Sequence, residues 1–241
     1  TETDVEDGYR GLIVVRDGRT LEIRGEFPSF GESPHDCVLR DQGKTLWVTN
    51  GGARTPGGEA PSVTAIDVAS QRLLEKLAFE SPALSAGHLA LSQRGDLAVV
   101  SAMREWMDKD FGGALSLRPR GQSFQIMVDP PEVCARMLGE SLSVAIHEPT
   151  STVAVTNPRG HMVTFWDLER AVFRKKLELA WPRGVAVAGE RFLLSHGLSG
   201  KLLPIDAATL EPLPEEEAAQ SAMNGSHVFV HALPSFETAP A

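Results

Sequence analysis

Short runs of apolar residues alternate along the chain with short polar turns. One pattern recurs: an apolar strand, an aspartate and a tight polar turn, found at 12–18, 63–67, 163–167 and 202–206. A fifth copy, at 114–119, lacks the aspartate. Because an aspartate side chain accepts hydrogen bonds from backbone amides two residues further on, these aspartates are predicted to close turns.

A hairpin precedes each of the last four copies. Each consists of two apolar runs joined by a tight turn, at 35–50, 88–101, 143–157 and 184–196. The hairpins start 53, 55 and 41 residues apart, and two hairpins per repeat make four strands. Four antiparallel strands at such a period are typical of a β-propeller blade. The sequence therefore predicts an all-β fold, a β-propeller of four-stranded antiparallel blades, in preference to a sandwich or a barrel.

The two ends of the chain hold complementary parts of a blade. Residues 1–27 supply an outer hairpin whose inner hairpin is mostly missing, and 226–233 supply an inner strand without outer ones. The chain thus represents about five blades, either as a closed ring or as the C-terminal portion of a longer one. Since no methionine precedes Thr1, the second is expected. The propeller is expected to span 1–233, with 234–241 as a flexible tail.

One segment, 130–139, breaks the strand pattern. It begins with two prolines, ends at Gly139, and carries Val133 and Met137 on one helical face. These signals predict a short surface helix inserted between blades.

Composition excludes several classes of function. The 241 residues carry a formal net charge of −9, which opposes nucleic-acid binding. No apolar stretch approaches the roughly 18 residues of a transmembrane helix, so no transmembrane segment is expected. GxSxG, P-loop, HExxH and CxxCH motifs are absent, which removes support for the common hydrolase, nucleotide-binding, zinc-protease and cytochrome functions. Cys37 and Cys134 either pair or remain thiols.

Three histidines stand at the starts of predicted inner strands: His35, His88 and His227. Radial repetition of blades would bring them together at the mouth of the central channel. Converging imidazoles can bind a transition metal such as iron or copper, with Asp36 as a further ligand or as the acceptor that orients a ring. Alternatively, each histidine donates to the backbone of a neighbouring blade and has a structural role.

A second group of polar residues lies at the ends of second strands and in the loops that follow them. Such loops share one face of a propeller, where an arginine cluster would bind a carboxylate or phosphate and a tryptophan would provide a flat contact surface. Exposed or loop-pinning arginines, and a tryptophan packed on the next blade, are the alternative. The candidate ligand-binding residues are Asn50, Arg54, Arg104, Trp106, Asn157, Arg159 and His196.

An ordered set of motifs carries a family resemblance. It includes Ser-Pro-His-Asp at 33–36, Thr-Asn-Gly-Gly at 49–52, Thr-Asn-Pro-Arg-Gly at 156–160 and Arg-Gly-Val-Ala at 183–186. The set resembles an uncharacterised bacterial β-propeller family, a domain of unknown function related to YVTN and WD40-like propellers. The resemblance implies a ring of about seven blades, twin-arginine export to the periplasm, and genes beside those of imelysin-like and di-haem iron-uptake proteins.

The resemblance supplies no established activity. The expected function is that of a non-catalytic periplasmic propeller that binds a ligand, a metal or a partner protein in iron uptake, with periplasmic iron-handling proteins as partners. The alternative is a propeller enzyme, similar to lactonases or quinoprotein dehydrogenases, that acts on a small anionic substrate.

Overall fold

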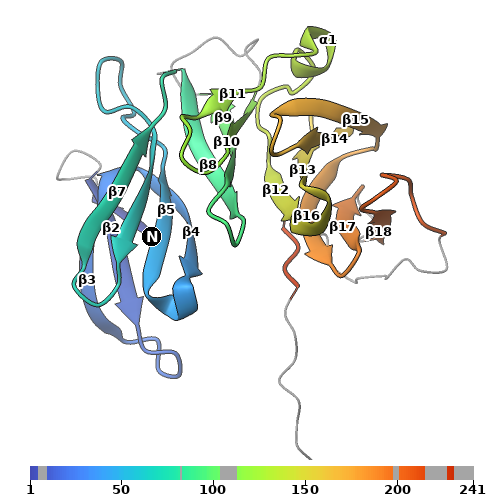
Figure 1. Cartoon of the computed structure of the whole chain (residues 1–241). Helices are drawn as coiled ribbons and strands as arrows, with labels where there is room; N and C mark the ends of the chain where they lie inside the picture. Colours follow the sequence, from blue (N-terminus) through green and yellow to red (C-terminus); the bar gives the residue numbers. More distant parts are fainter. Residues whose placement is uncertain (5–9, 82, 104–112, 198–200, 215–226, 231–241) are drawn as a thin grey trace, which may run out of the picture.

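Five antiparallel sheets follow one another along the chain in the computed structural model (Figure 1). The structure describes residues 1–4, 10–81, 83–103, 113–197, 201–214 and 227–230. The first sheet contains β1 (Glu2–Asp4), β2 (Arg10–Arg16) and β3 (Ile23–Glu32). The second contains β4 (Pro34–Arg40), β5 (Thr45–Asn50), β6 (Ser62–Asp67) and β7 (Arg72–Ala78).

The remaining sheets repeat this arrangement. The third contains β8 (Leu84–Leu91), β9 (Leu97–Met103), β10 (Ala114–Arg118) and β11 (Gln125–Ile126). The fourth contains β12 (Ser143–His147), β13 (Thr152–Asn157), β14 (Met162–Asp167) and β15 (Val172–Glu178). The fifth contains β16 (Pro182–Ala188), β17 (Arg191–His196) and β18 (Lys201–Asp206). Strands pair in sequence order within every sheet, which confirms the predicted blades.

The hydrophobic core lies between the faces of successive sheets. Strand β13 is buried along its whole length, and its side chains alternate between two clusters. Val153 and Val155 pack with the third sheet, whereas Ala154 packs with the fifth. The outermost strand β15 instead alternates between exposed and half-buried residues, and its half-buried Phe173 and Leu177 pack against the clusters on the two sides of the sheet. This packing requires sheets on both sides of a blade, as in a propeller.

Aspartates close the turns that follow β2, β6, β14 and β18, as the repeat predicted. Asp67 Oδ1 accepts a hydrogen bond of 2.7 Å from the amide of Ser70. The same role is taken by Asp17 toward Arg19 and Thr20, by Asp167 toward Arg170, and by Asp206 toward Ala208 and Thr209. Two of the predicted inner turns are short 3-10 helices, η1 (Asp41–Gly43) and η2 (Glu148–Thr150).

The inserted segment differs from its prediction. Helix α1 (Pro131–Cys134) is only four residues long, and the chain continues in turns to Gly139, whose φ is +72°. Val133 and Met137 do share a face, but both are buried in the cluster between the third and fourth sheets. The segment therefore fills the core between two blades, whereas the prediction placed it on the surface, because its apolar residues find a partner there.

The first and last sheets have three strands each in the described part of the chain, and they lie at opposite ends of the row of sheets (Figure 1). Strands β2 and β3 correspond to β6 and β7, so the N-terminal residues do form an outer hairpin. The predicted inner strand at 227–230 is wrong: this segment has no strand pairing. Its backbone passes close to Gly184 of β16.

The structure bears directly on two other sequence predictions. Cys37 and Cys134 are both free thiols, and desolvation raises the pKa of each. Among the described residues, no helix is both long and apolar enough to cross a membrane. The predicted tail at 234–241 lies outside the described residues.

Candidate metal centre

Four inner strands present one equivalent position, which their pairing with the next strand defines. The strand pairings Cys37 with Val48, Leu89 with Val99, Val144 with Val155 and Val185 with Leu194 fix the correspondence. The residue preceding each of these is Asp36, His88, Ser143 or Gly184. His35 therefore stands one residue before the position that His88 occupies, and the two are not strictly equivalent. Irregular pairing within β4 and β8 at this point still brings both rings together.

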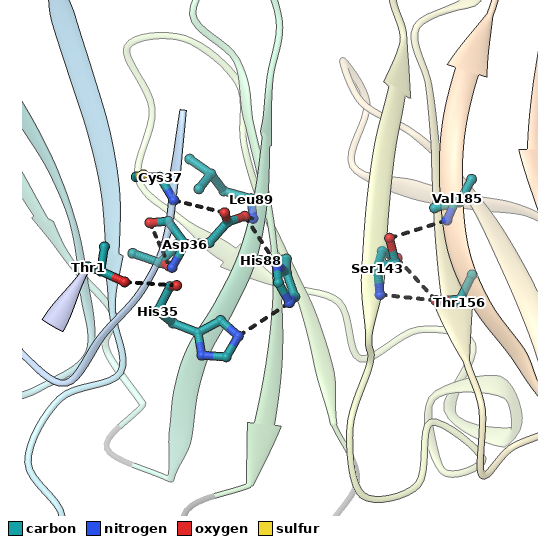
Figure 2. Close-up of polar contacts among 10 residues, drawn as sticks. Thr1, His35, Asp36, Cys37, His88, Leu89, Ser143, Thr156 and Val185 are labelled. Carbon is teal, nitrogen blue, oxygen red and sulfur yellow. Dashed lines mark hydrogen bonds and ion pairs between the residues drawn. The ribbon is translucent and has the colours of Figure 1, made fainter. Parts of the chain in front are cut away.

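The predicted histidines converge on one another from three separate segments. His35 Nε2 lies 3.2 Å from His88 Nε2 (Figure 2). The ring of His227 lies on the other side of His88, with a distance of 4.3 Å between ring centroids. Residues separated by as many as 192 positions in the sequence thus form one cluster, which we call the histidine cluster: His35, Asp36, His88 and His227.

Asp36 holds His88 in place. Its Oδ2 lies 3.2 Å from His88 Nδ1 and also accepts a hydrogen bond from the amide of Leu89. Oδ1 accepts a second backbone hydrogen bond, from Cys37 (Figure 2). A carboxylate behind Nδ1 fixes the imidazole tautomer with its proton on Nδ1, so the Nε2 lone pair points away from Asp36.

Ser143 repeats the role of Asp36 one pair of sheets further along. Its Oγ accepts a hydrogen bond from the amide of Val185, just as Asp36 accepts one from Leu89 (Figure 2). Sequence reasoning missed Ser143, although aligning the repeats on their second strands would have placed it beside Asp36. At Asp36 and at Ser143 the shared position therefore links one blade to the next through a hydrogen bond. Asp36 also contacts the ring of His88.

The charge states of the cluster favour metal ligation. Desolvation, and then the nearby charge of His88, lower the pKa of His35, and the same two causes lower the pKa of His227. Desolvation acts to raise the pKa of Asp36, but hydrogen bonds from His88 and two backbone amides outweigh it and lower the pKa. The neutral imidazoles of His35 and His227 and the ionised carboxylate of Asp36 are forms that suit a metal site.

The distance between the two Nε2 atoms fits shared ligation. Two nitrogens bound tetrahedrally to one ion at about 2.0–2.1 Å are about 3.3 Å apart. No group of three or more His, Cys, Asp or Glu side chains within the described residues has the geometry of a formed metal site. Asp36 faces Nδ1 of His88, so it orients the ring instead of joining the ligand set. A third protein ligand would require His227 to turn.

A cavity of about 230 Å³ adjoins the histidine cluster. Asp36, His88 and Ser143 line it together with 185–187 of β16 and the segment 227–230. It lies where the inner strands β4, β8, β12 and β16 meet, so a molecule in the cavity would touch the open side of His88. The cluster is therefore placed at the centre of the row of sheets.

The two asparagines of the second predicted site are interior residues. Asn50 and Asn157 are both 0% exposed. Asn50 accepts from Ser29 Oγ and donates to Thr64 Oγ1. Asn157 makes the corresponding bonds, from Ser141 Oγ and to Thr164 Oγ1. Asn50 thereby links β3 of the first sheet to β6 of the second, and Asn157 links Ser141 to β14. Because both amides are completely buried, neither is accessible to a ligand.

The other members of that set lie on different blades. Arg54 is exposed in the loop after β5, and Arg159 is exposed in the turn after β13, with its side chain over Gly139. His196 is half-buried at the end of β17. Arg104 and Trp106 lie outside the described residues, so the predicted anion-binding cluster on this face stays a prediction.

Comparisons with known proteins agree with the fold and assign no activity. The model of the family described as "Protein of unknown function (DUF1513)" matches residues 1–227. No curated protein matches the chain. Among solved structures, hydrazine synthase of Kuenenia stuttgartiensis is similar, with a TM-score of 0.63 and 16% identity over 84% of this chain and 66% of that one.

Two further structures share the architecture. A nidogen/laminin complex has a TM-score of 0.56 and 14% identity, over 86% of this chain and 70% of that one. The dihydro-heme d1 dehydrogenase NirN in complex with DHE has a TM-score of 0.56 and 16% identity, over 86% and 42%. The chain thus spans about two thirds of the first structure and less than half of NirN. At such identities the likeness shows the fold alone, which is that of a β-propeller.

Proposed function

We propose that this chain, which belongs to the DUF1513 family of unknown function, is a non-catalytic binding protein that holds a transition-metal ion between His35 and His88. The observation that carries the proposal is the 3.2 Å approach of their Nε2 atoms, with Asp36 Oδ2 behind His88 Nδ1. Imidazole nitrogens suit copper, iron and zinc. His227 supplies a third ring, and the adjoining cavity leaves room for the remaining ligands.

We also propose the setting in which such a protein works. It would be exported to the periplasm and would handle iron together with other periplasmic proteins. The support is the resemblance of the ordered sequence motifs to exported propellers of unknown function.

Metal analysis tests the proposal directly. The protein would be purified without chelator, analysed for bound metal, and titrated calorimetrically with Cu²⁺, Zn²⁺ and Fe²⁺. We expect stoichiometric binding that the double variant His35→Ala, His88→Ala abolishes. His161→Asn is the control, because His161 is an exposed turn histidine with φ of +51°, a conformation that asparagine tolerates.

Two outcomes would overturn it. One is the absence of binding for all three ions. The other is equal binding by wild type and the double variant when circular dichroism shows both folded, because binding would then occur elsewhere.

A second candidate function, an enzyme, is favoured by the pairing of Asp36 with His88. A carboxylate behind the imidazole of a residue that lines a cavity is an arrangement used for general base catalysis. Screening a panel of lactones and alcohols, with and without divalent metal, tests it. Turnover that His88→Gln removes would support the enzyme, whereas inactivity throughout would reject it.

A further inference from the structure

The third sheet departs from the repeat at Arg118. Strand pairing places Arg118 opposite Leu97. At the corresponding position the second, fourth and fifth sheets have completely buried apolar residues, namely Ile66, Trp166 and Ile205. The side chain of Arg118 is only 10% exposed. Burying a guanidinium where a blade otherwise places a large apolar side chain costs stability, so this exception calls for a reason.

Hydrogen bonds within the protein use only part of this guanidinium. Nη2 of Arg118 donates to Glu75 Oε1 at 2.9 Å, across the boundary to the second sheet. Nε donates to the carbonyl of Gln122 at 2.9 Å. Nη1 has no hydrogen-bond partner among the described residues. One edge of a nearly buried cation therefore stays available to a ligand.

Arg118 lines a cavity of about 410 Å³ between the second and third sheets, which we call the arginine pocket. Three further arginines line it: Arg40, Arg94 and Arg120. Asp41 and Glu75 are the carboxylates in its lining, so the cations outnumber the anions four to two in a chain whose net charge is −9. The pocket is thus a local site of positive charge on an acidic protein.

The four arginines differ in the hydrogen bonds and ion pairs that they already make within the protein. Arg94 pairs with Glu169 and Asp96, and Arg40 donates to the carbonyl of Leu91. The guanidinium of Arg120 makes no hydrogen bond or ion pair with any residue that the structure describes. Arg120 and the free edge of Arg118 are therefore the groups that a ligand would meet.

The arginine pocket is separate from the histidine cluster. Arg40 and Leu91 are the last residues of β4 and β8, whereas His35 is the second residue of β4 and His88 lies three residues before the end of β8. Five residues of extended chain separate His35 from Arg40, which corresponds to about 16 Å. The two sites therefore lie at different positions along β4 and β8, and no residue lines both cavities.

We propose that the arginine pocket binds a small organic anion that carries a carboxylate or phosphate group on an apolar, ring-sized body. Guanidinium groups pair two oxygens of such a head group at once. Half-buried Trp47 and Leu91, which also line the pocket, offer apolar contact to the body of the ligand. The volume lies within the range of small-molecule sites, about 300–1,000 Å³.

Calorimetric titration with four probes tests the proposal: benzoate, phenyl phosphate, inorganic phosphate and uncharged benzyl alcohol. We expect benzoate or phenyl phosphate to bind one per chain, and benzyl alcohol not to bind. Whichever of benzoate and phenyl phosphate binds more tightly identifies the head group. Weaker binding of inorganic phosphate than of phenyl phosphate shows that the apolar body contributes to affinity. Absence of binding by both organic anions at millimolar concentration would overturn the proposal.

A matched pair of variants locates the site. Arg120→Gln should weaken binding by about tenfold or more, since it removes a charge-assisted hydrogen bond. It should leave folding intact, because the Arg120 guanidinium has no hydrogen-bond or ion-pair partner among the described residues. Arg170→Gln is the control, because Arg170 is an exposed arginine on the corresponding turn of the fourth sheet. Equal affinity of Arg120→Gln and Arg170→Gln would overturn the assignment to this pocket.

Discussion

At the scale of single residues, His88 contacts two other members of the histidine cluster, one through each nitrogen of its ring. Its Nδ1 faces Asp36, which also accepts a hydrogen bond from the next residue, Leu89. Its Nε2 faces His35. The sequence indicated that these residues would meet, but it offered Asp36 as either a ligand or an orienting acceptor. The geometry favours the second, because the carboxylate lies behind the ring.

We expect the titration of His35 and His227 to control the pH dependence of the cluster. In the folded protein the pKa values of both histidines are lowered from the ordinary 6.5. At a pH between the lowered pKa values and 6.5, the folded protein therefore binds fewer protons than the unfolded chain. The free energy of unfolding should therefore rise with pH across that window. Ring titrations followed by NMR measure the pKa values.

The variant His88→Ala provides the control for this titration. Removing the nearby positive charge should move the pKa of His35 back toward 6.5. A pKa of His35 at or above 6.5 in the wild type would contradict the prediction.

At the scale of elements, the glycine at position 184 decides where the segment 227–230 lies. A Cβ at Gly184 would stand 2.6 Å from the amide nitrogen of Val228 and 2.7 Å from the carbonyl carbon of His227. The lack of a side chain at the start of β16 thus lets the backbone of a distant segment approach it. This contact brings His227 to the ring of His88.

We expect Gly184→Ala to displace the segment 227–230 and to separate His227 from His88. Hydrogen exchange at Val228 should accelerate, and metal affinity should fall if His227 contributes a ligand. Gly25→Ala is the control, because Gly25 also lies in a strand but has no atom within 4 Å of an added Cβ. Unchanged exchange at Val228 would show that the segment adapts to the methyl group.

A fork of two hydrogen bonds fastens the inserted segment to the fourth sheet. Arg136 Nη1 and Nη2 donate to the two carboxylate oxygens of Glu178, at 2.7 and 2.8 Å. The bonds from Arg136 and then from Lys176 lower the pKa of Glu178 to about 2. Both partners are more than a third exposed, so their contribution to stability is modest.

We expect this fork to open as the pH falls from about 4.5 to about 2. A carboxylate whose pKa is lower in the folded state stabilises that state at any pH above its pKa in the unfolded chain. The stabilisation is lost as the pH falls through its pKa in the folded protein. NMR titration of the Glu178 carboxyl should show a midpoint near 2 in the wild type and a higher one in Arg136→Met. The same midpoint in both proteins would show that Arg136 does not hold the carboxylate.

At the scale of the whole molecule, successive sheets are joined by apolar clusters and by hydrogen bonds at one repeated place. Asp36 and Ser143 each accept a bond from the backbone of the following sheet. Thr156 adds a second bond from the fourth sheet, to the carbonyl of Arg183 in the fifth. These directional bonds set the angle between neighbouring sheets, which apolar contact alone leaves loose.

We expect Ser143→Ala to lower the free energy of unfolding by about 1–3 kcal/mol, because the buried amide of Val185 loses its side-chain acceptor. Ser62→Ala is the matched control. Ser62 Oγ is buried and has no hydrogen-bond partner within the described part of the chain, so its removal should be neutral or stabilising. Urea unfolding of both variants measures the difference, and equal losses would contradict the structural role of Ser143.

The sequence by itself determined the blades and their turns, and it indicated the residues of the histidine cluster, although His227 reaches the cluster without an inner strand. Strand periodicity and the aspartate turns are local, so they can be read along the chain. The placement of Ser143, Gly184 and Arg118 was decided only by the tertiary structure, because each owes its role to a neighbouring sheet or to a distant segment. Strand 227–230 was mispredicted for the same reason: an apolar run forms a strand only where a partner edge is available to it.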